Sequence, residues 1–335
     1  MTKILFVYNK EIVSFIQKDL NTLEKHFHVR VVRYSGTTDL LKIFRGILWS
    51  NIVFSWFASL HSFYVVIFSK IIGRKSIIVA GGYDVAFCPG IKYGSIFYWW
   101  KRWCSILTLK FATLILTISK ANTEEAIENA KANRSKTKLV YLGFDFDYYK
   151  PNSNVKKEPV VLTVGAVSRS NLLRKGLEVF VKSAHLLPNF KFILVGRWMD
   201  DSVRHLKSVA SRNIYFLDNL DNKELLNLFR RSKVYVQASY HEGFGCSLAE
   251  AMLCECIPVV TKVAALPEVV GDCGFFLIDQ SPEKLAALIN KALNGDPELG
   301  KRARERIKKL FPLEKREKTL LQIVEQLMSQ KRKIL

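Results

Sequence analysis

The stretch YVQASYHEGFGCSLAEAM, residues 235–252, combines a strand, a tight turn and the beginning of a helix. Its first residues are mostly apolar, aromatic or β-branched, which is typical of a buried strand. Gly243 and Gly245 follow, and glycine lets the backbone turn sharply and approach a bound molecule closely. The helix that begins at Cys246 and Ser247 directs its first N–H groups toward this turn. The stretch therefore predicts an anion-binding strand–turn–helix unit of an α/β protein.

Two acidic residues flank the turn in a chain whose formal charge is +21. Glu242 lies just before the glycines, and Glu250 lies about one and a half turns into the helix. A carboxylate is a poor partner for phosphate but a good hydrogen-bond acceptor for hydroxyl groups. A ligand with a diphosphate in its middle and a sugar at each end suits both glutamates and nearby cations. Nucleotide sugars have this composition.

A similar unit occurs earlier, in VLTVGAVSRSNLLRKGLEVF, residues 161–180. The strand ends at Gly165, the loop carries Arg169, and Lys175 stands where a helix begins. An arginine and a lysine six residues apart can contact one phosphate group from two sides. The alternative is that both are solvated surface cations.

Short apolar runs bounded by turn residues occur six times in each half of the chain, separated by helix-length segments. They alternate little, as expected of strands buried on both faces of a parallel sheet. The runs are KILFVYN, HVRVVRY, NIVFSWF, SIIVAGG, TLILTIS and KLVYLG, then VVLTVGA, FKFILVG, NIYFLD, VYVQAS, IPVVTK and GFFLI. The sequence predicts two successive doubly wound α/β domains, with a ligand cleft at the carboxyl ends of their strands.

Charge and cysteine content limit the class of protein. The basic surplus suits nucleic acid, an anionic membrane surface or phosphorylated substrates, but both halves share it almost equally, whereas nucleic-acid binding favours a cluster. Six scattered cysteines and the lack of a signal peptide predict a reducing cytoplasm. The Cys254-x-Cys256 pair has no second pair at zinc-ligand spacing, so no metal site is predicted.

Two stretches bear on membranes. Residues 46–69 contain no charged residue, but polar residues interrupt them, and we interpret them as a strand, a turn and a helix rather than a span. The run IFYWWKRWC, residues 96–104, holds three tryptophans beside a lysine and an arginine. It predicts an interfacial helix on anionic lipid, and burial of the aromatics against the sheet is the alternative.

Several of these segments resemble a known family. RSNLLRKG, EGFGCSLAEAM, IPVV and LPEVVGDCGFFL are similar to the donor domain of the large retaining glycosyltransferase family that includes sucrose synthases and mannosyltransferases. That family has the GT-B fold, which consists of two Rossmann-like doubly wound parallel-sheet domains facing across a cleft. The resemblance spans about residues 110–330, and the two glutamates eight residues apart around Gly-Phe-Gly are its most specific feature.

The resemblance implies that different parts of the chain bind the acceptor and the donor. Residues 1–150 would bind the acceptor, residues 151–310 would bind the donor after a polar break at 150–159, and residues 311–335 would form a helix packing back toward the junction. Arg169 and Lys175 would bind the diphosphate. The remaining donor contacts implied are Glu242 with the backbone of Gly243-Phe244-Gly245 on the sugar, and Glu250 on the ribose. The family needs no metal or other cofactor, and a leaving-group oxygen can take the acceptor's proton, so no base is assigned.

The first half departs from the family pattern. No glycine-rich loop follows the first strand, and AGGYDVA, residues 80–86, replaces the usual histidine-glycine pair. Asp84 becomes the candidate that orients the acceptor or steadies charge, with a Gly-Gly turn partner as the alternative. Asp145 and Asp147 in GFDFDYYKP are interpreted as a structural turn rather than a metal motif.

The expected function is transfer of a sugar from a nucleotide-diphosphate sugar to an acceptor hydroxyl, on a glycan or lipid-linked glycan, with retention of configuration. The expected location is the cytoplasm, with peripheral contact at the inner face of the membrane. Two alternatives stay open. One is a catalytically idle nucleotide-sugar-binding protein, which the departures in the first half favour, and the other is a nucleic-acid-binding protein, suggested by charge.

Overall fold

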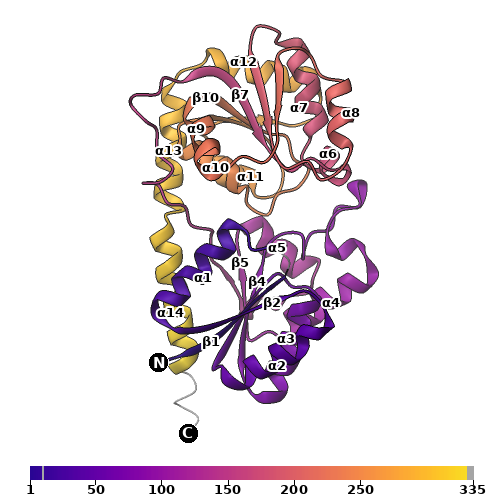
Figure 1. The fold of residues 1–335 in the computed structure, drawn as a ribbon, viewed down its shortest axis with the longest axis vertical. Helices are drawn as coiled ribbons and strands as arrows, with labels where there is room; N and C mark the ends of the chain where they lie inside the picture. The colour runs from indigo at the N-terminus through magenta and orange to yellow at the C-terminus, as the bar shows by residue number, and fades with distance from the viewer. Residues whose placement is uncertain (10, 330–335) are drawn as a thin grey trace. The chain divides into compact units, whose positions relative to one another are not determined.

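The computed structural model describes residues 1–9 and 11–329, and these form two compact units (Figure 1). The first contains Met1–Gly143 together with the segment that begins at Leu313, and the second contains Phe144–Pro312. Each unit has one six-stranded parallel sheet with helices on both faces. The predicted α/β class with two Rossmann-like sheets is confirmed, while the predicted roles of the two domains and the cleft stay predictions.

In the first unit the strand order is β2-β1-β3-β4-β5-β6. The strands are β1 (Lys3–Asn9), β2 (His28–Tyr34), β3 (Ile52–Trp56), β4 (Lys75–Ala80), β5 (Leu114–Thr117) and β6 (Thr137–Leu139). The chain runs outward from β1 to β2 and then returns to β3 on the other side of β1. The switch point between β1 and β3 opens the carboxyl edge of this sheet for a ligand.

The helices of the first unit cover both faces of its sheet. They are α1 (Ser14–His26), α2 (Leu40–Trp49), α3 (Leu60–Ile72), α4 (Trp99–Phe111), α5 (Lys120–Glu128) and α14 (Leu313–Ser329). In Figure 1, α2, α3 and α4 lie side by side, and α1 lies beside α14. The uncharged stretch 46–69 forms the end of α2, β3 and most of α3, as predicted. Within residues 1–9 and 11–329, no helix combines the length and apolarity needed to cross a bilayer.

Helix α14 joins the first unit through a buried ion pair. The Arg316 guanidinium donates to both carboxylate oxygens of Asp19, at 2.6 and 2.7 Å. Its remaining nitrogen donates to the carbonyls of Val140 and Tyr141, at 2.8 and 2.9 Å. The Trp56 indole also donates to Asp19, at 3.1 Å. Helix α14, which the sequence placed near the junction, is thus part of the first unit; residues 330–335 of the expected segment lie outside the described residues.

In the second unit the strand order is β12-β11-β10-β7-β8-β9. The strands are β7 (Glu158–Val164), β8 (Lys191–Val195), β9 (Ile214–Leu217), β10 (Ser232–Gln237), β11 (Ile257–Thr261) and β12 (Phe275–Leu277). The switch point falls between β7 and β10, which are paired in parallel. The loops that follow these two strands therefore leave the carboxyl edge of the sheet as neighbours, although about seventy residues separate them in sequence.

Eight helices are assigned to the second unit within the described residues. They are α6 (Arg169–Arg174), α7 (Leu177–Ser183), α8 (Ser202–Ser208), α9 (Asn222–Arg231), α10 (Cys246–Leu253), α11 (Leu266–Val270), α12 (Pro282–Asn294) and α13 (Glu298–Leu310).

The segment GFDFDYYKP forms the turn that the sequence predicted. The Asp145 carboxylate accepts the backbone N–H groups of Asp147 and Tyr148, both at 2.9 Å.

Candidate functional site

The loops after β7 and β10 are fixed to each other by close backbone contacts. Gly176 has a φ of +61°, and a Cβ there would lie 2.0 Å from the carbonyl oxygen of Ala238. The Tyr240 N–H also donates to the Arg174 carbonyl, at 2.8 Å. Only glycine permits both this backbone conformation and this approach. The docking places Lys175 beside Glu242.

Lys175 and Glu242 form an ion pair in which the ammonium donates to the carboxylate. The two side chains are 17% and 10% exposed, and the Arg174 guanidinium lies 3.8 Å from the same oxygen. Ser239 donates a further hydrogen bond, at 2.9 Å. Burial would raise the pKa of Glu242, but the charges of Lys175 and Arg174 and the hydrogen bonds from Lys175 and Ser239 outweigh it and lower that pKa to about 2. Glu242 is therefore an ionised acceptor at any physiological pH.

Gly165 lies under the stem of Lys175. A Cβ at Gly165 would contact the Lys175 Cγ and Cδ atoms, each at 3.6 Å. The Gly165 N–H continues the sheet by donating to the Val195 carbonyl, at 2.8 Å. Gly165 thus lets the lysine stem lie across the end of β7 while its ammonium reaches Glu242.

The glycine turn before α10 is anchored by an aromatic cluster. Gly245 has a φ of +95° and precedes the first residue of α10. Phe244 is 2% exposed, and its ring stacks on that of Phe144 with the centroids 5.5 Å apart. It also packs edge to face with the Phe311 ring, with the centroids 5.1 Å apart. The Phe244 side chain therefore belongs to the core of this unit. Gly243 is partly exposed, so a ligand role for residues 243–245 would come from their backbone N–H groups.

Glu250 lies in the second turn of α10 and is 7% exposed. The pKa of the Tyr149 hydroxyl is raised, first by burial and then by the charge of Glu250 and a hydrogen bond to that carboxylate. The pKa of the Tyr235 hydroxyl is also raised, first by burial and then by the charges of Glu242 and Glu250. The two glutamates are therefore close enough to act on one phenol. Neither tyrosine was singled out from the sequence, although Tyr235 is the first residue of the stretch that indicated the site.

Arg169 is placed differently from Lys175. It is exposed at the start of α6, its backbone N–H donates to Asp200 at 2.9 Å, and it lines a pocket of about 380 Å³ with Tyr240 and Gln280. In the described part of the chain, no ion pair or hydrogen bond joins its guanidinium to Glu242. The arginine near Glu242 is Arg174, which the sequence did not single out. The predicted contact of Arg169 with a diphosphate stays a prediction.

Asp84 lies in the first unit and is 1% exposed. Its carboxylate oxygens accept the backbone N–H groups of Ala58, at 2.7 Å, and Gly81, at 2.9 Å. Burial raises the pKa of Asp84 to about 6, despite these hydrogen bonds. Asp84 joins the loop after β3 to the loop after β4, as in the turn-partner alternative. A part for it in catalysis stays a prediction.

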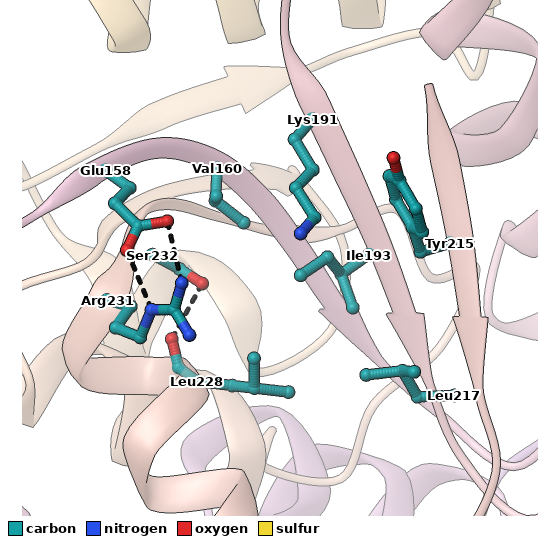
Figure 2. Close-up of a pocket in the computed structure, with 9 residues that line it drawn as sticks. All are labelled: Glu158, Val160, Lys191, Ile193, Tyr215, Leu217, Leu228, Arg231 and Ser232. Carbon is teal, nitrogen blue, oxygen red and sulfur yellow. Dashed lines mark hydrogen bonds and ion pairs between the residues drawn. The ribbon is translucent and has the colours of Figure 1, made fainter. Parts of the chain in front are cut away.

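A smaller pocket of about 140 Å³ lies at the amino edge of the second sheet (Figure 2). The Arg231 guanidinium donates to both oxygens of Glu158, at 2.7 and 3.1 Å, and the Lys191 ammonium lies 4.6 Å from the Tyr215 ring centroid. Arg231 and Glu158 thus pair with each other, and Lys191 lies over an aromatic ring. Doubly wound sheets bind ligands at the opposite, carboxyl edge. This pocket is not part of the candidate site.

Across residues 1–9 and 11–329, no group of three or more His, Cys, Asp or Glu side chains is arranged to hold a metal ion.

The second unit matches known proteins in sequence. Residues 145–310 match the family described as Glycosyl transferases group 1. The O-antigen chain mannosyltransferase B of Escherichia coli is 30% identical over 207 residues, covering 56% of this chain and 54% of that protein. The D-inositol 3-phosphate glycosyltransferase of Mycolicibacterium smegmatis is 25% identical over 175 residues, covering 48% and 40%. The matches span about half the length of these relatives.

Solved structures share the fold of the chain. Anabaena HepE in complex with UDP and glucose has a TM-score of 0.81 at 19% identity, covering 97% of this chain and 100% of that chain. Sucrose-phosphate synthase from Thermosynechococcus elongatus has a TM-score of 0.77 at 18% identity, covering 98% and 100%. The two Rossmann-like sheets are therefore those of a GT-B protein. Residues 145–310, which are nearly all of the second unit, thus match a Glycosyl transferases group 1 domain.

Proposed function

We propose that this protein transfers a sugar from a nucleotide-diphosphate sugar to an acceptor hydroxyl, with retention of configuration and without a metal. The observation that carries the proposal is the largely buried Lys175–Glu242 pair at the switch point of the second sheet. The pair lies next to the turn from which α10 begins. It supplies a cation for phosphate and a carboxylate for hydroxyls at the edge where such sheets bind ligands.

In this proposal the donor exchanges the partners of the ion pair. The diphosphate takes the Lys175 ammonium, and hydroxyls of the donor sugar take Glu242, which stays ionised because of its low pKa. As the bond to the diphosphate breaks, negative charge grows on the leaving group. Lys175 and the N–H groups of residues 243–246 are preorganised donors for that charge. The leaving-group oxygen accepts the acceptor's proton, so no other base is needed.

The ribose is assigned to Glu250. Its carboxylate is held in the second turn of α10 and already accepts a hydrogen bond from the Tyr149 hydroxyl. A carboxylate has several acceptor positions, so ribose hydroxyls could bind the remaining ones. Isothermal titration calorimetry of Glu250→Ala tests this assignment. Unchanged affinity for the nucleotide would contradict it.

The relatives suggest where the search for a donor should begin. HepE has been solved with UDP-glucose, and one curated relative is a mannosyltransferase. A panel of labelled donors that includes UDP-glucose and GDP-mannose is incubated with the protein and candidate acceptor glycans. Transfer establishes the enzyme, and NMR of the new anomeric centre tests retention. Binding of a donor with neither transfer nor hydrolysis would instead indicate an idle nucleotide-sugar-binding protein.

Metal independence is tested in the same assay. Preincubation with EDTA should leave the rate unchanged, because the proposal gives leaving-group stabilisation to Lys175 and backbone N–H groups rather than to a cation in solution. Loss of activity that added Mg²⁺ or Mn²⁺ restores would contradict this part of the proposal.

We also propose that the protein acts in the cytoplasm, with α4 touching an anionic membrane surface. Trp99 and Trp103 are 77% and 56% exposed, and Arg102 on the same helix is exposed. Exposed tryptophans beside basic residues favour the interface of an anionic bilayer. Flotation with anionic vesicles should recover the protein, and a Trp99→Ser/Trp103→Ser double variant should be recovered less. Equal recovery of the wild-type protein with neutral and with anionic vesicles would contradict the proposed attraction to anionic lipid.

A further inference from the structure

A pocket of about 380 Å³ opens within the first unit, at the carboxyl edge of its sheet. Asn9, Tyr34, Phe57 and Asp84 line it from the ends of β1 to β4, and Trp100 and Lys101 line it from α4. The switch point of this sheet lies between β1 and β3, so the pocket occupies the position where doubly wound sheets bind ligands. Its volume is in the range of small-molecule sites.

The pocket lining has a strained backbone at Phe57. Phe57 has a φ of 69°, which is the left-handed region that residues with a side chain seldom adopt. Its ring fills the space above Gly81, where a Cβ would lie 2.2 Å from a ring carbon. The Phe57 N–H donates to the Val79 carbonyl at 2.8 Å, and Asp84 holds the N–H of Ala58. Backbone strain that is held in place by its surroundings is concentrated at ligand sites.

One fixed cation faces this pocket. The Lys101 ammonium lies 4.5, 5.4 and 5.5 Å from the ring centroids of Tyr98, Trp100 and Tyr83. It also donates to the Tyr83 hydroxyl, at 3.1 Å. Within the residues that the structure describes, it forms no ion pair with a carboxylate, and both oxygens of Asp84 are taken by backbone N–H groups. A lysine held in this way is a point charge suited to a phosphate group.

The rest of the lining suits a sugar ring. The rings of Tyr34, Tyr83 and Trp100 give apolar surfaces, and Ser59 gives a hydroxyl. The His61 Nε2 lies 2.9 Å from the Trp56 carbonyl, so this nitrogen carries the proton. The other ring nitrogen of the neutral imidazole then accepts the Ser59 proton, at 2.8 Å, and leaves the Ser59 oxygen as an acceptor for a ligand hydroxyl. Apolar ring faces combined with a hydroxyl acceptor match the two sides of a pyranose.

We propose that this pocket binds the acceptor, and that the acceptor is a sugar with a phosphate or diphosphate attached, the ring against the aromatic wall and the phosphate at Lys101. The inference rests on the proposed function and names the substrate class of its second substrate. The phosphate can belong to a free sugar phosphate or to a lipid-linked sugar diphosphate, which share this chemistry.

The test measures binding to the full-length protein by ligand-observed NMR. The probes are a hexose 1-phosphate, the matching methyl hexoside, and the same hexose joined through a diphosphate to a short isoprenyl chain. At least one phosphorylated probe should bind about tenfold or more tightly than the methyl hexoside, the effect of one charge-assisted hydrogen bond. Lys101→Met should abolish this preference. Lys110→Met, an exposed lysine near the end of the same helix, is the matched control and should keep it.

The outcomes separate the two sources and the two proposals. Lys101-dependent binding of both phosphorylated probes supports recognition of the phosphate alone, and binding of the isoprenyl probe alone supports a lipid-linked acceptor. The proposal is overturned if no phosphorylated probe binds better than the methyl hexoside, or if Lys175→Met rather than Lys101→Met removes the preference. UDP titration is the second readout: Lys101→Met should bind UDP like the wild type. Failure of the proposed function would instead appear as a wild-type protein that binds no nucleotide.

Discussion

Lys175 and Glu242 illustrate how one residue pair serves two states of a site. Without a donor each neutralises the other, which lets two charged side chains lie almost buried. Burying either charge alone would be costly. In the proposed function, each side chain exchanges its partner for a group of the donor, so the charges stay compensated. On that proposal the pair is a preformed anion and hydroxyl site as well as a structural ion pair.

The first prediction concerns Lys175. Lys175→Met removes one fixed donor to the leaving diphosphate, and the turnover of the donor should fall by about 10² to 10³. Measurement of kcat and KM with the donor found in the panel checks this. Lys223→Met, an exposed lysine in the first turn of α9, is the control and should leave both constants unchanged. A Lys175→Met enzyme with near-normal kcat would refute the role.

His61 should make the stability of the first unit depend on pH. Burial lowers the pKa of His61 to about 4, against about 6.5 in the unfolded chain. The unfolded state therefore binds a proton at a higher pH, and the stability due to neutral His61 is present above pH 6.5 and lost as the pH falls toward 4. The free energy of unfolding of the first unit should therefore fall by about 3 kcal/mol as the pH is lowered through this range.

Urea unfolding at pH 7 and pH 4.5 measures this loss. His61→Gln keeps a donor for the Trp56 carbonyl but cannot titrate, so its unfolding free energy should fall less between these two pH values than that of the wild type. His26→Gln, at an exposed histidine on α1, should behave like the wild type. An identical pH dependence in wild type and His61→Gln would show that His61 is not the titrating group.

At the scale of elements, the strands were predictable because their signal is local. A strand buried on both faces of a parallel sheet is a continuous apolar run, and each of the twelve runs in the sequence corresponds to a strand. The contacts of the site were less predictable. Lys175 meets Glu242 across 67 residues because β10 lies beside β7, and strand order is not encoded in local periodicity. For the same reason, the sequence did not show that Arg174 rather than Arg169 would lie near Glu242.

Helix α14 should depend on its buried ion pair for stable attachment to the first unit. The side chains of Arg316 and Asp19 are 3% and 1% exposed, and removing one partner of such a pair leaves a buried charge. Arg316→Met should therefore lower the unfolding free energy of the first unit by about 3–5 kcal/mol. Arg204→Met, in the exposed pair with Asp201, should leave the urea midpoint unchanged. An Arg316→Met protein as stable as the wild type would show that the buried pair contributes nothing.

The first unit is discontinuous in sequence, because the second unit is inserted between Gly143 and Leu313. Helix α14 supplies the buried side chains of Leu320, Ile323 and Val324 to the first unit. A chain that ends at Pro312 should lose hydrogen-exchange protection in β1 to β6 and keep it in β7 to β12. Protection lost equally in both units would mean that the two fold as one cooperative body.

The buried Arg316–Asp19 pair also affects the order in which the two units can fold during synthesis. Asp19 leaves the ribosome early, whereas Arg316 emerges 297 residues later, after all of β7 to β12. The inserted unit can thus complete its sheet on the nascent chain while the amino-terminal one still waits for its closing helix. A nascent chain in which residues 1–312 lie outside the ribosome, joined to a carboxyl-terminal linker that fills the exit tunnel, should carry a protease-resistant second unit and a cleavable first one.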